Sequence, residues 1–147
     1  MIYLDSSYLV RCYLEDPGYR EVRELAASDH VACATLGQAE VVAAFHRKLR
    51  EGALTPAACA ATVRQFETDL LNGVVTWLPI TAVILQQVRL AFGSLPATVF
   101  LRSADALHLV CARESGLLEI HSNDRHLLAA APQFGLKGVN VIPLPGT

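Results

Sequence analysis

Four acidic residues in this sequence lie beside or inside apolar segments, where a carboxylate needs a partner. Asp5 and Asp124 each follow an apolar run that is typical of a buried strand. Glu40 lies in the first turn of a helix that follows another such run, and Asp105 lies in a helix among alanine and leucine. The carboxyl ends of parallel strands share one edge of a sheet, so these side chains are able to converge there.

Converging carboxylates require a positive charge among them. Like charges packed together raise one another's pKa values, and an unpaired buried carboxylate costs several kcal/mol. Mg²⁺ and Mn²⁺ are hard ions that prefer carboxylate oxygen and keep waters in their shell. We therefore expect a Mg²⁺ or Mn²⁺ site, with ligands drawn from these four residues: Asp5, Glu40, Asp105 and Asp124.

Each acid also has a purely structural interpretation. Asp124 is suited to cap the N-terminus of the helix that follows it. Glu40 is favoured in a first turn by the helix dipole. Asp105 could be neutralised by the neighbouring Arg102 instead of by a metal. The residues alone leave these alternatives open.

Apolar segments that end at turn residues alternate with amphipathic segments along the whole chain. The expected strands are 2–4, 31–36, 74–78, 118–121 and 139–142. The expected helices are 8–15, 19–27, 38–50, 57–71, 81–92, 100–114 and 124–130. This order predicts an α/β protein with a mostly parallel sheet and helices on both faces. With no repeat, linker or low-complexity tract, residues 1–147 are expected to form a single domain.

Composition narrows the class of protein. Hydrophobic residues make up 52% of the chain and charged residues 18%, which excludes a disordered protein and favours a dimer or another partner chain. No apolar run reaches the roughly 18 residues of a membrane span, and the chain starts without a basic leader. The four cysteines are far apart in sequence, as expected for reduced thiols in the cytoplasm.

The charge balance is compatible with a nucleic-acid partner without establishing one. The chain has 12 basic and 14 acidic residues, a net charge of −2. If four acids surround a metal, the other 10 face 12 bases and the remaining surface is slightly positive. Most of the bases are arginine, whose planar fork suits phosphate.

The four segments that carry the acids resemble a known family. IYLDSSYLV, LGQAEVVAAF, LRSADALHLVCA and IHSNDRHLL are similar, in order and spacing, to motifs of the PIN-domain ribonucleases, and most of all to the VapC-type toxins of bacterial toxin–antitoxin pairs. Two positions depart from the family: Gly37-Gln38 replaces a Ser/Thr-rich turn, and His126 stands where many relatives have an acid.

The resemblance implies both a fold and an activity. The fold would be a three-layer α/β/α sandwich, and Asp5, Glu40, Asp105 and Asp124 would be the acidic quartet of the family. The activity would be metal-dependent endonuclease cleavage of RNA that leaves a 3′-hydroxyl and a 5′-phosphate. The protein would form a homodimer and be silenced by an antitoxin whose tail covers the active site.

Further residues are expected to assist this site. Ser7 and Ser122 are candidates to orient the carboxylates by hydrogen bonding, although turn or cap chemistry alone also explains them. Arg102 and Arg125 are candidates for contact with substrate phosphate, or for salt bridges to neighbouring acids. His108 follows Asp105 by one helical turn and is expected to be a hydrogen-bonded core histidine.

Three rival functions are weighed against the nuclease. A PIN-like module could bind RNA or protein without cutting, but such modules tend to lose the acids that this chain keeps. A phosphatase with an aspartyl nucleophile needs a second acid two places later, where this chain has Ser7. A dinucleotide-binding protein needs a Gly-x-Gly-x-x-Gly turn after a strand, and the sequence contains none.

Overall fold

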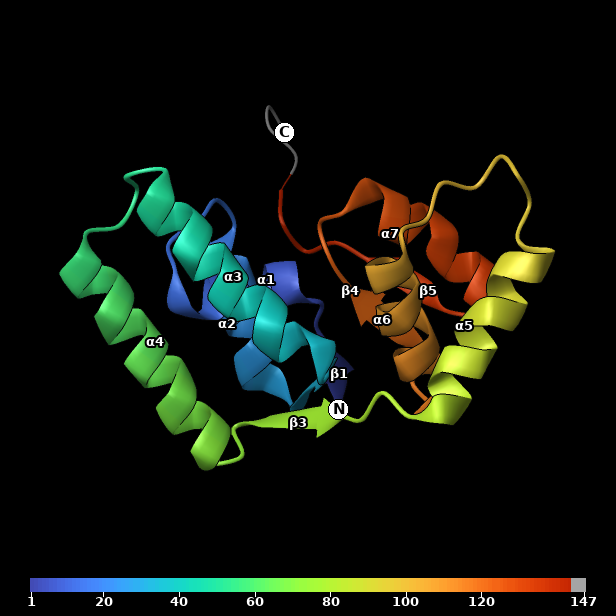
Figure 1. Ribbon diagram of the computed structural model, residues 1–147, viewed down its shortest axis with the longest axis horizontal. Coiled ribbons are helices and arrows are strands. Elements are labelled where there is room, and N and C mark those ends of the chain that lie inside the picture. Colours follow the sequence, from blue (N-terminus) through green and yellow to red (C-terminus); the bar gives the residue numbers. More distant parts are fainter. Residues whose placement is uncertain (144–147) are drawn as a thin grey trace.

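The computed structural model describes residues 1–143, in which strands and helices alternate from one end to the other (Figure 1). The strands are β1 (Ile2–Tyr3), β2 (Val31–Ala34), β3 (Val75–Leu78), β4 (Glu119–His121) and β5 (Lys137–Val139). The helices are α1 (Ser6–Tyr13), α2 (Tyr19–Ser28), α3 (Leu36–Arg50), α4 (Pro56–Leu71), α5 (Ala82–Ser94), α6 (Ser103–Glu114) and α7 (Arg125–Ala130). A short 3-10 helix, η1 (Ala131–Phe134), continues α7.

The strands form one parallel row with β1 at its centre. β1 pairs with β2 and β2 with β3, while β4 pairs with β5, in every case parallel. A parallel bridge between Leu4 and His121 joins the two sheets, giving the order β3-β2-β1-β4-β5. The chain thus moves outward from β1 to β3 and returns to the other side of β1. In open α/β sheets, ligands bind at the carboxyl ends of the strands where the order reverses, here between β1 and β4.

Two apolar layers cover the two faces of the sheet. Successive side chains of a strand point to opposite faces, so Tyr3 packs with α5, α6 and α7 while Leu4 packs with α1 to α4. Ile120 of β4 joins the first layer and Cys33 of β2 joins the second. Figure 1 shows the two helical groups on either side of the strands. The expected three-layer α/β/α sandwich on a parallel sheet is confirmed.

Two helices begin at other residues than their apolar patterns predict. α1 starts at Ser6 rather than at residue 8, because the Asp5 carboxylate accepts a hydrogen bond from the Tyr8 amide at 2.9 Å and caps the helix. α6 starts at Ser103 rather than at residue 100, because Arg102 is extended with φ −89° and ψ 158°. Both changes bear on the site, since Asp5 and Arg102 are among its expected residues.

The last strand lies two residues before its expected position. Residues 139–142 were expected to pair, but β5 is Lys137–Val139, with Gly138 opposite Ile120. A Cβ on Gly138 would lie 2.9 Å from the Leu128 carbonyl oxygen, so this close approach of α7 needs glycine. The apolar residues beyond β5 instead pack against the layer formed by α1 to α4. Their apolar pattern reflects helix contact and not strand pairing.

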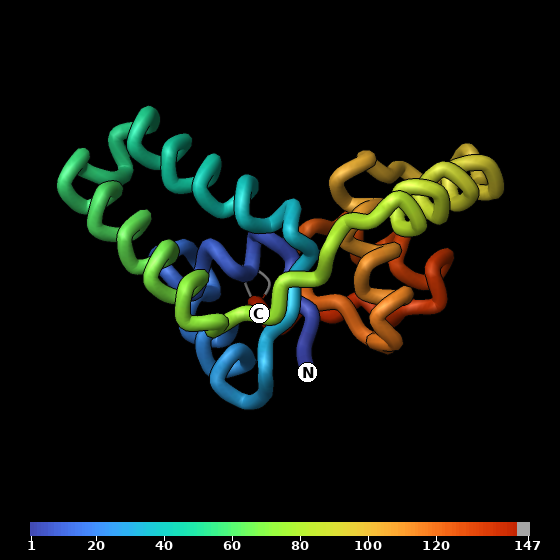
Figure 2. Tube along the Cα trace, turned by 60° about the horizontal axis from the view of Figure 1, so that its bottom comes forward, coloured from blue at the N-terminus to red at the C-terminus, as the bar shows by residue number. Residues whose placement is uncertain are grey.

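Helices α3 and α4 run side by side away from the sheet, and the chain then crosses from β3 to α5 on the opposite side (Figure 2). All four cysteines are free thiols, as expected. Within residues 1–143, no helix is both long enough and apolar enough to span a membrane.

Candidate active site

The expected acids line one pocket. A cavity of about 660 Å³ opens between the start of α1, the first half of α3, the start of α6 and the segment before α7. Its lining includes Asp5, Glu40, Asp105 and Asp124, together with Ser7 and Arg102. The pocket therefore lies at the carboxyl ends of β1 and β4, where the strand order reverses.

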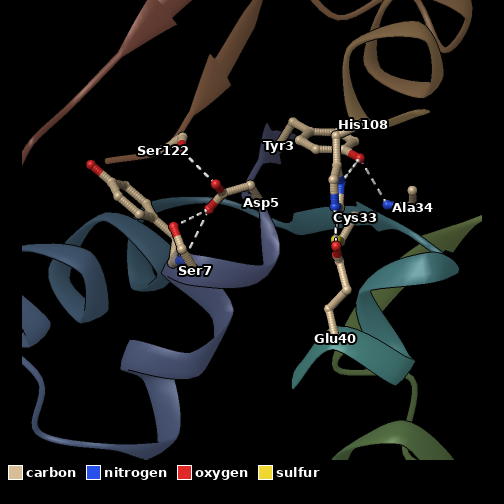
Figure 3. Close-up of polar contacts among 9 residues, drawn as sticks. Tyr3, Asp5, Ser7, Cys33, Ala34, Glu40, His108 and Ser122 are labelled. Carbon is tan, nitrogen blue, oxygen red and sulfur yellow. Dashed lines mark hydrogen bonds and ion pairs between the residues drawn. The ribbon is translucent and has the colours of Figure 1, made fainter. Parts of the chain in front are cut away.

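Asp5 is the most deeply buried acid of the pocket. Its side chain is 4% exposed and stands between Ser7, whose hydroxyl donates to Oδ1 at 2.7 Å, and Ser122, whose hydroxyl donates to Oδ2 (Figure 3). Burial raises the pKa of Asp5, although the hydrogen bonds from Ser122, Ser7 and the Tyr8 amide act in the opposite direction. The two serines thus hold a buried carboxylate in one orientation.

Asp105 has an oxygen without a partner. Within residues 1–143, its Oδ2 is buried and accepts no hydrogen bond. Burial raises the pKa of Asp105, the negative charge of Asp124 raises it further, and His108 and Arg102 lower it. Arg102 forms no ion pair with any carboxylate of the described chain, so the alternative in which it pairs with Asp105 is not realised. An unpartnered buried carboxylate oxygen is unusual in a folded protein, and a cation is one partner that would suit it.

Asp124 caps a helix and lines the pocket at the same time. Its Oδ1 accepts hydrogen bonds from the amides of His126 at 2.7 Å and Leu127 at 3.2 Å, as expected for an N-cap. In the described chain both bonds use the same oxygen, which leaves Oδ2 available to a ligand. The structural and the functional interpretations of Asp124 are therefore compatible.

Glu40 is held by a buried chain of hydrogen bonds. The Ala34 amide donates to Tyr3 Oη at 3.0 Å, Tyr3 Oη lies 2.7 Å from His108 Nδ1, and His108 Nε2 lies 2.7 Å from Glu40 Oε2 (Figure 3). Because Tyr3 Oη already accepts from a backbone amide, its own hydrogen is free to go to Nδ1. The imidazole then donates from Nε2 to the carboxylate of Glu40.

This arrangement also sets the ionisation of Glu40. Burial on its own would raise the pKa of Glu40, but the hydrogen bond and the charge of His108, together with a hydrogen bond from Ser6, outweigh it, and the pKa lies below its ordinary value. His108 is 2% exposed, which confirms the expected hydrogen-bonded core histidine. Glu40 is consequently an ionised acid at the pocket wall.

The donor chemistry of the pocket suits a hard divalent cation. Within the part of the chain that the structure describes, no three His, Cys, Asp or Glu side chains are gathered closely enough to hold a metal ion. Among the side chains of these four types, those that line the pocket are nevertheless all carboxylates, and the buried Asp105 Oδ2 accepts no hydrogen bond from residues 1–143. Carboxylate oxygen is the donor that Mg²⁺ and Mn²⁺ prefer.

The remaining expected residues differ in their positions. Ser122 is fully buried behind Asp5, and Arg102 lies at the pocket wall. Arg125 does not line the pocket, and its Nε instead approaches His126 Nε2 at 3.4 Å. Its expected contact with substrate phosphate stays a prediction.

The pocket also contains residues that the sequence did not single out. These are mainly Ser6, Arg11, Asp16, Arg47 and Asn123. Arg47 follows Glu40 by seven positions, which places both side chains on one face of α3, two turns apart. That spacing could have identified it. Asn123 Oδ1 lies 2.8 Å from Ser7 Oγ, a contact across the fold that no local pattern signals.

Comparison with known proteins agrees with this geometry. The sequence pattern of the PIN domain matches residues 2–132. The chain belongs to the PIN domain family. No curated protein matches it in sequence.

Solved structures of PIN-domain size share its fold. VapC20 of Mycobacterium tuberculosis, described as a sarcin–ricin loop cleaving toxin, is 19% identical with a TM-score of 0.67, over 88% of this chain and 95% of that chain. VapBC2 of Rickettsia felis, bound to a promoter DNA fragment, is 14% identical with a TM-score of 0.66, over 95% and 98%. FitAcB of Neisseria gonorrhoeae is 16% identical with a TM-score of 0.67, over 98% and 100%. At these identities the likeness concerns the fold.

Proposed function

We propose that this PIN domain is a metal-dependent endoribonuclease and the toxin of a type II toxin–antitoxin pair. The observation that carries the proposal is the convergence of Asp5, Glu40, Asp105 and Asp124 on one pocket, with one carboxylate oxygen of Asp105 buried and unpartnered within residues 1–143. The charges of Asp124 and Asp5 raise the pKa of Asp105, and a bound cation would relieve this repulsion.

The residues of the pocket have distinct tasks in this proposal. Asp5, Asp105 and Asp124, with Glu40 beside them, are the ligands for Mg²⁺ or Mn²⁺. Such an ion, when bound, lowers the pKa of water and offsets charge on the phosphate.

The other side chains position these acids and the substrate. Ser7 and Ser122 fix the rotamer of Asp5, and His108 fixes that of Glu40. Arg102 at the pocket wall is placed to contact the phosphate that is cut, and Arg125, outside the pocket, to contact a phosphate further along the strand.

The partners are RNA, an antitoxin and a second copy of the chain. VapBC2 and FitAB, a further solved structure with a TM-score of 0.68, are each bound to a DNA fragment, which supports a DNA-binding antitoxin partner here. Exposed apolar side chains on α5 support a homodimer: Val83, Leu85 and Leu90. Free thiols favour the reducing cytoplasm, and residues 1–147 act as one domain in this proposal.

The test is cleavage of end-labelled RNA. The purified protein is incubated with total RNA and with a sarcin–ricin loop hairpin, the RNA named for the neighbour VapC20, in the presence of Mg²⁺, Mn²⁺ or EDTA. We expect discrete cuts with either metal, none in EDTA, and none with Asp5→Asn at equal folding. A metal-independent cut that survives Asp5→Asn would indicate a contaminating nuclease. Binding of RNA without cleavage in any metal would favour the alternative, a catalytically inactive PIN-like module that binds RNA or protein.

A further inference from the structure

An aromatic side chain is exposed beside the acid pocket. Phe100 lies in the segment between α5 and α6 and is 54% exposed. Its neighbours Val99 and Leu101 pack against the core, and the Val99 amide donates to the Pro96 carbonyl at 2.9 Å. The segment is therefore fixed on both sides of Phe100. Because Val99 and Leu101 are directed into the core, the Phe100 ring faces solvent.

Two polar side chains lie beside this ring, and a third lies beside one of them. The imidazole of His126 lies against it, with ring centroids 4.5 Å apart and planes inclined at 51°. The Arg102 guanidinium carbon lies 5.8 Å from the centroid of the same ring. Arg125 Nε approaches the far nitrogen of His126 at 3.4 Å. We name these four residues the Phe100 surface.

The Phe100 surface is continuous with the acid pocket. Arg102 lines the pocket together with Asp105 and Asp124, and the His126 amide donates to Asp124 Oδ1 at 2.7 Å. The segment between α5 and α6 passes close to the start of α7, where Asp124 stands (Figure 1). A group bound on Phe100 is thus a close neighbour of a group bound by the acids.

The chemistry of the Phe100 surface fits an unpaired nucleobase. Aromatic rings stack bases of any sequence, and an adjacent arginine adds a cation to the sugar–phosphate side. Within residues 1–143 neither Arg102 nor Arg125 forms an ion pair with a carboxylate, so the guanidinium group of each is available to bind an anion.

We infer that Phe100, backed by His126, stacks an unpaired base of the RNA next to the phosphate that is cut in the acid pocket. The inference rests on the proposed nuclease function. Stacking on Phe100 would favour single-stranded or looped RNA over a duplex, because a base must leave its helix to reach the ring.

The test compares Phe100→Leu with Phe100→Tyr and with the matched control Phe92→Leu. Phe92 is also exposed, at 41%, but lies on α5 and does not line the pocket. The substrate is a single-stranded RNA oligonucleotide around a mapped cleavage site. We expect Phe100→Leu to lower kcat/KM by roughly 5- to 100-fold, the range for loss of one stacked base, with Phe100→Tyr and Phe92→Leu near wild type. Equal effects of the two leucine variants would overturn the inference.

An abasic nucleotide provides the decisive control. When the abasic nucleotide is placed beside the scissile phosphate, the wild type should cleave that RNA as slowly as Phe100→Leu cleaves the intact RNA. Phe100→Leu should cleave the abasic RNA no more slowly than the intact RNA. If the abasic nucleotide and Phe100→Leu each lower the cleavage rate and their effects multiply, the ring contacts something other than this base. Size-exclusion chromatography completes the control: if Phe100→Leu alone changes the oligomeric state, the ring faces a second copy of the chain and the inference is wrong.

A readout without cleavage separates this inference from the proposed function. The chain has a single tryptophan, Trp77, so extra emission in Phe100→Trp reports position 100. We expect single-stranded RNA, in EDTA, to quench that extra emission while heparin and duplex RNA do not. If the protein cuts no RNA but this quenching occurs, the nuclease proposal fails and base stacking stands. If it cuts RNA without the quenching, the nuclease stands and base stacking fails.

Discussion

His108 Nε2 lies 2.7 Å from Glu40 Oε2, although 68 positions separate the two residues in the chain. The other nitrogen of the same ring lies 2.7 Å from Tyr3 Oη in the core. One buried imidazole therefore links the stability of the core to the orientation of a pocket acid. These two tasks use different ring nitrogens, so they are separable by substitution.

Two amide substitutions at His108 should divide its roles. The Asn amide reaches the position of Nδ1 and the Gln amide that of Nε2. His108→Asn should keep the contact with Tyr3 and lose the one with Glu40, so cleavage falls about tenfold or more while unfolding is little changed. His108→Gln should leave the Tyr3 hydroxyl without its partner, which costs ~1–3 kcal/mol of stability. This variant should retain more activity than His108→Asn. Urea unfolding and kcat measure the two effects.

The exposed His46 provides the matched control, since His46→Asn and His46→Gln should change neither quantity. A parallel loss of stability and activity in both His108 variants would show that the imidazole acts only as a packed core residue. Restoration of kcat by excess Mg²⁺ in His108→Asn would indicate that the hydrogen bond acts through the metal affinity of Glu40.

The burial of Asp105 predicts a pH-dependent cost to folding. Its pKa is raised by burial and by Asp124, so the folded protein binds this proton more tightly than the unfolded chain does. Stability is then lost as the pH rises through the interval between the unfolded and the folded pKa. Asp105→Asn should raise the free energy of unfolding at pH 7 while abolishing cleavage.

The stability that Asp105→Asn gains over the wild type should shrink as the pH falls. It should vanish below about pH 4, where the Asp105 carboxyl is protonated in both the folded and the unfolded state. Denaturant unfolding at a series of pH values in EDTA measures it. Glu67→Gln, at an exposed position on α4, should show no such dependence. A gain that is constant with pH would mean that Asp105 is not a strained carboxylate.

Several of these relationships could be predicted from sequence and others could not. Asp5 and Asp124 were identifiable because a carboxylate after an apolar strand is a local pattern. Phe100 was expected inside a helix and lies before its first residue, Ser103, because Val99 and Leu101 pack against the core on either side of it. The contact of His108 with Glu40 depends on the register of whole elements, which no local pattern encodes.

The pocket acids should bind a divalent ion even in the absence of RNA. Mn²⁺ at ten times its dissociation constant should stabilise the wild type by ~1.4 kcal/mol, which raises Tm by roughly 4 °C. Differential scanning fluorimetry in excess KCl measures this shift without any nuclease assay. Asp5→Asn and Asp105→Asn should each lose it, whereas Glu67→Gln should keep it. An equal shift in all four proteins would place the ion elsewhere on the surface.

Arginines at the pocket should control the salt dependence of RNA binding. Arg47 and Arg102 both line the cavity, and neither forms an ion pair with a carboxylate of residues 1–143. The logarithm of the RNA association constant falls linearly with the logarithm of the salt concentration. Each phosphate contact on a single strand contributes about −0.7 to the slope of this line. Arg47→Ala and Arg102→Ala should each reduce the magnitude of that slope by about 0.7.

Arg64, exposed on α4 and outside the pocket lining, is the matched control for these two substitutions. Fluorescence anisotropy of labelled single-stranded RNA between 50 and 200 mM KCl, about the range over which counterion release is usually followed, gives the slopes. Because Arg47 lies two turns beyond Glu40 on α3, a change of slope in Arg47→Ala would extend the RNA path along that helix. If Arg64→Ala alters the slope as much as Arg47→Ala does, the binding is diffuse and no path through the pocket exists.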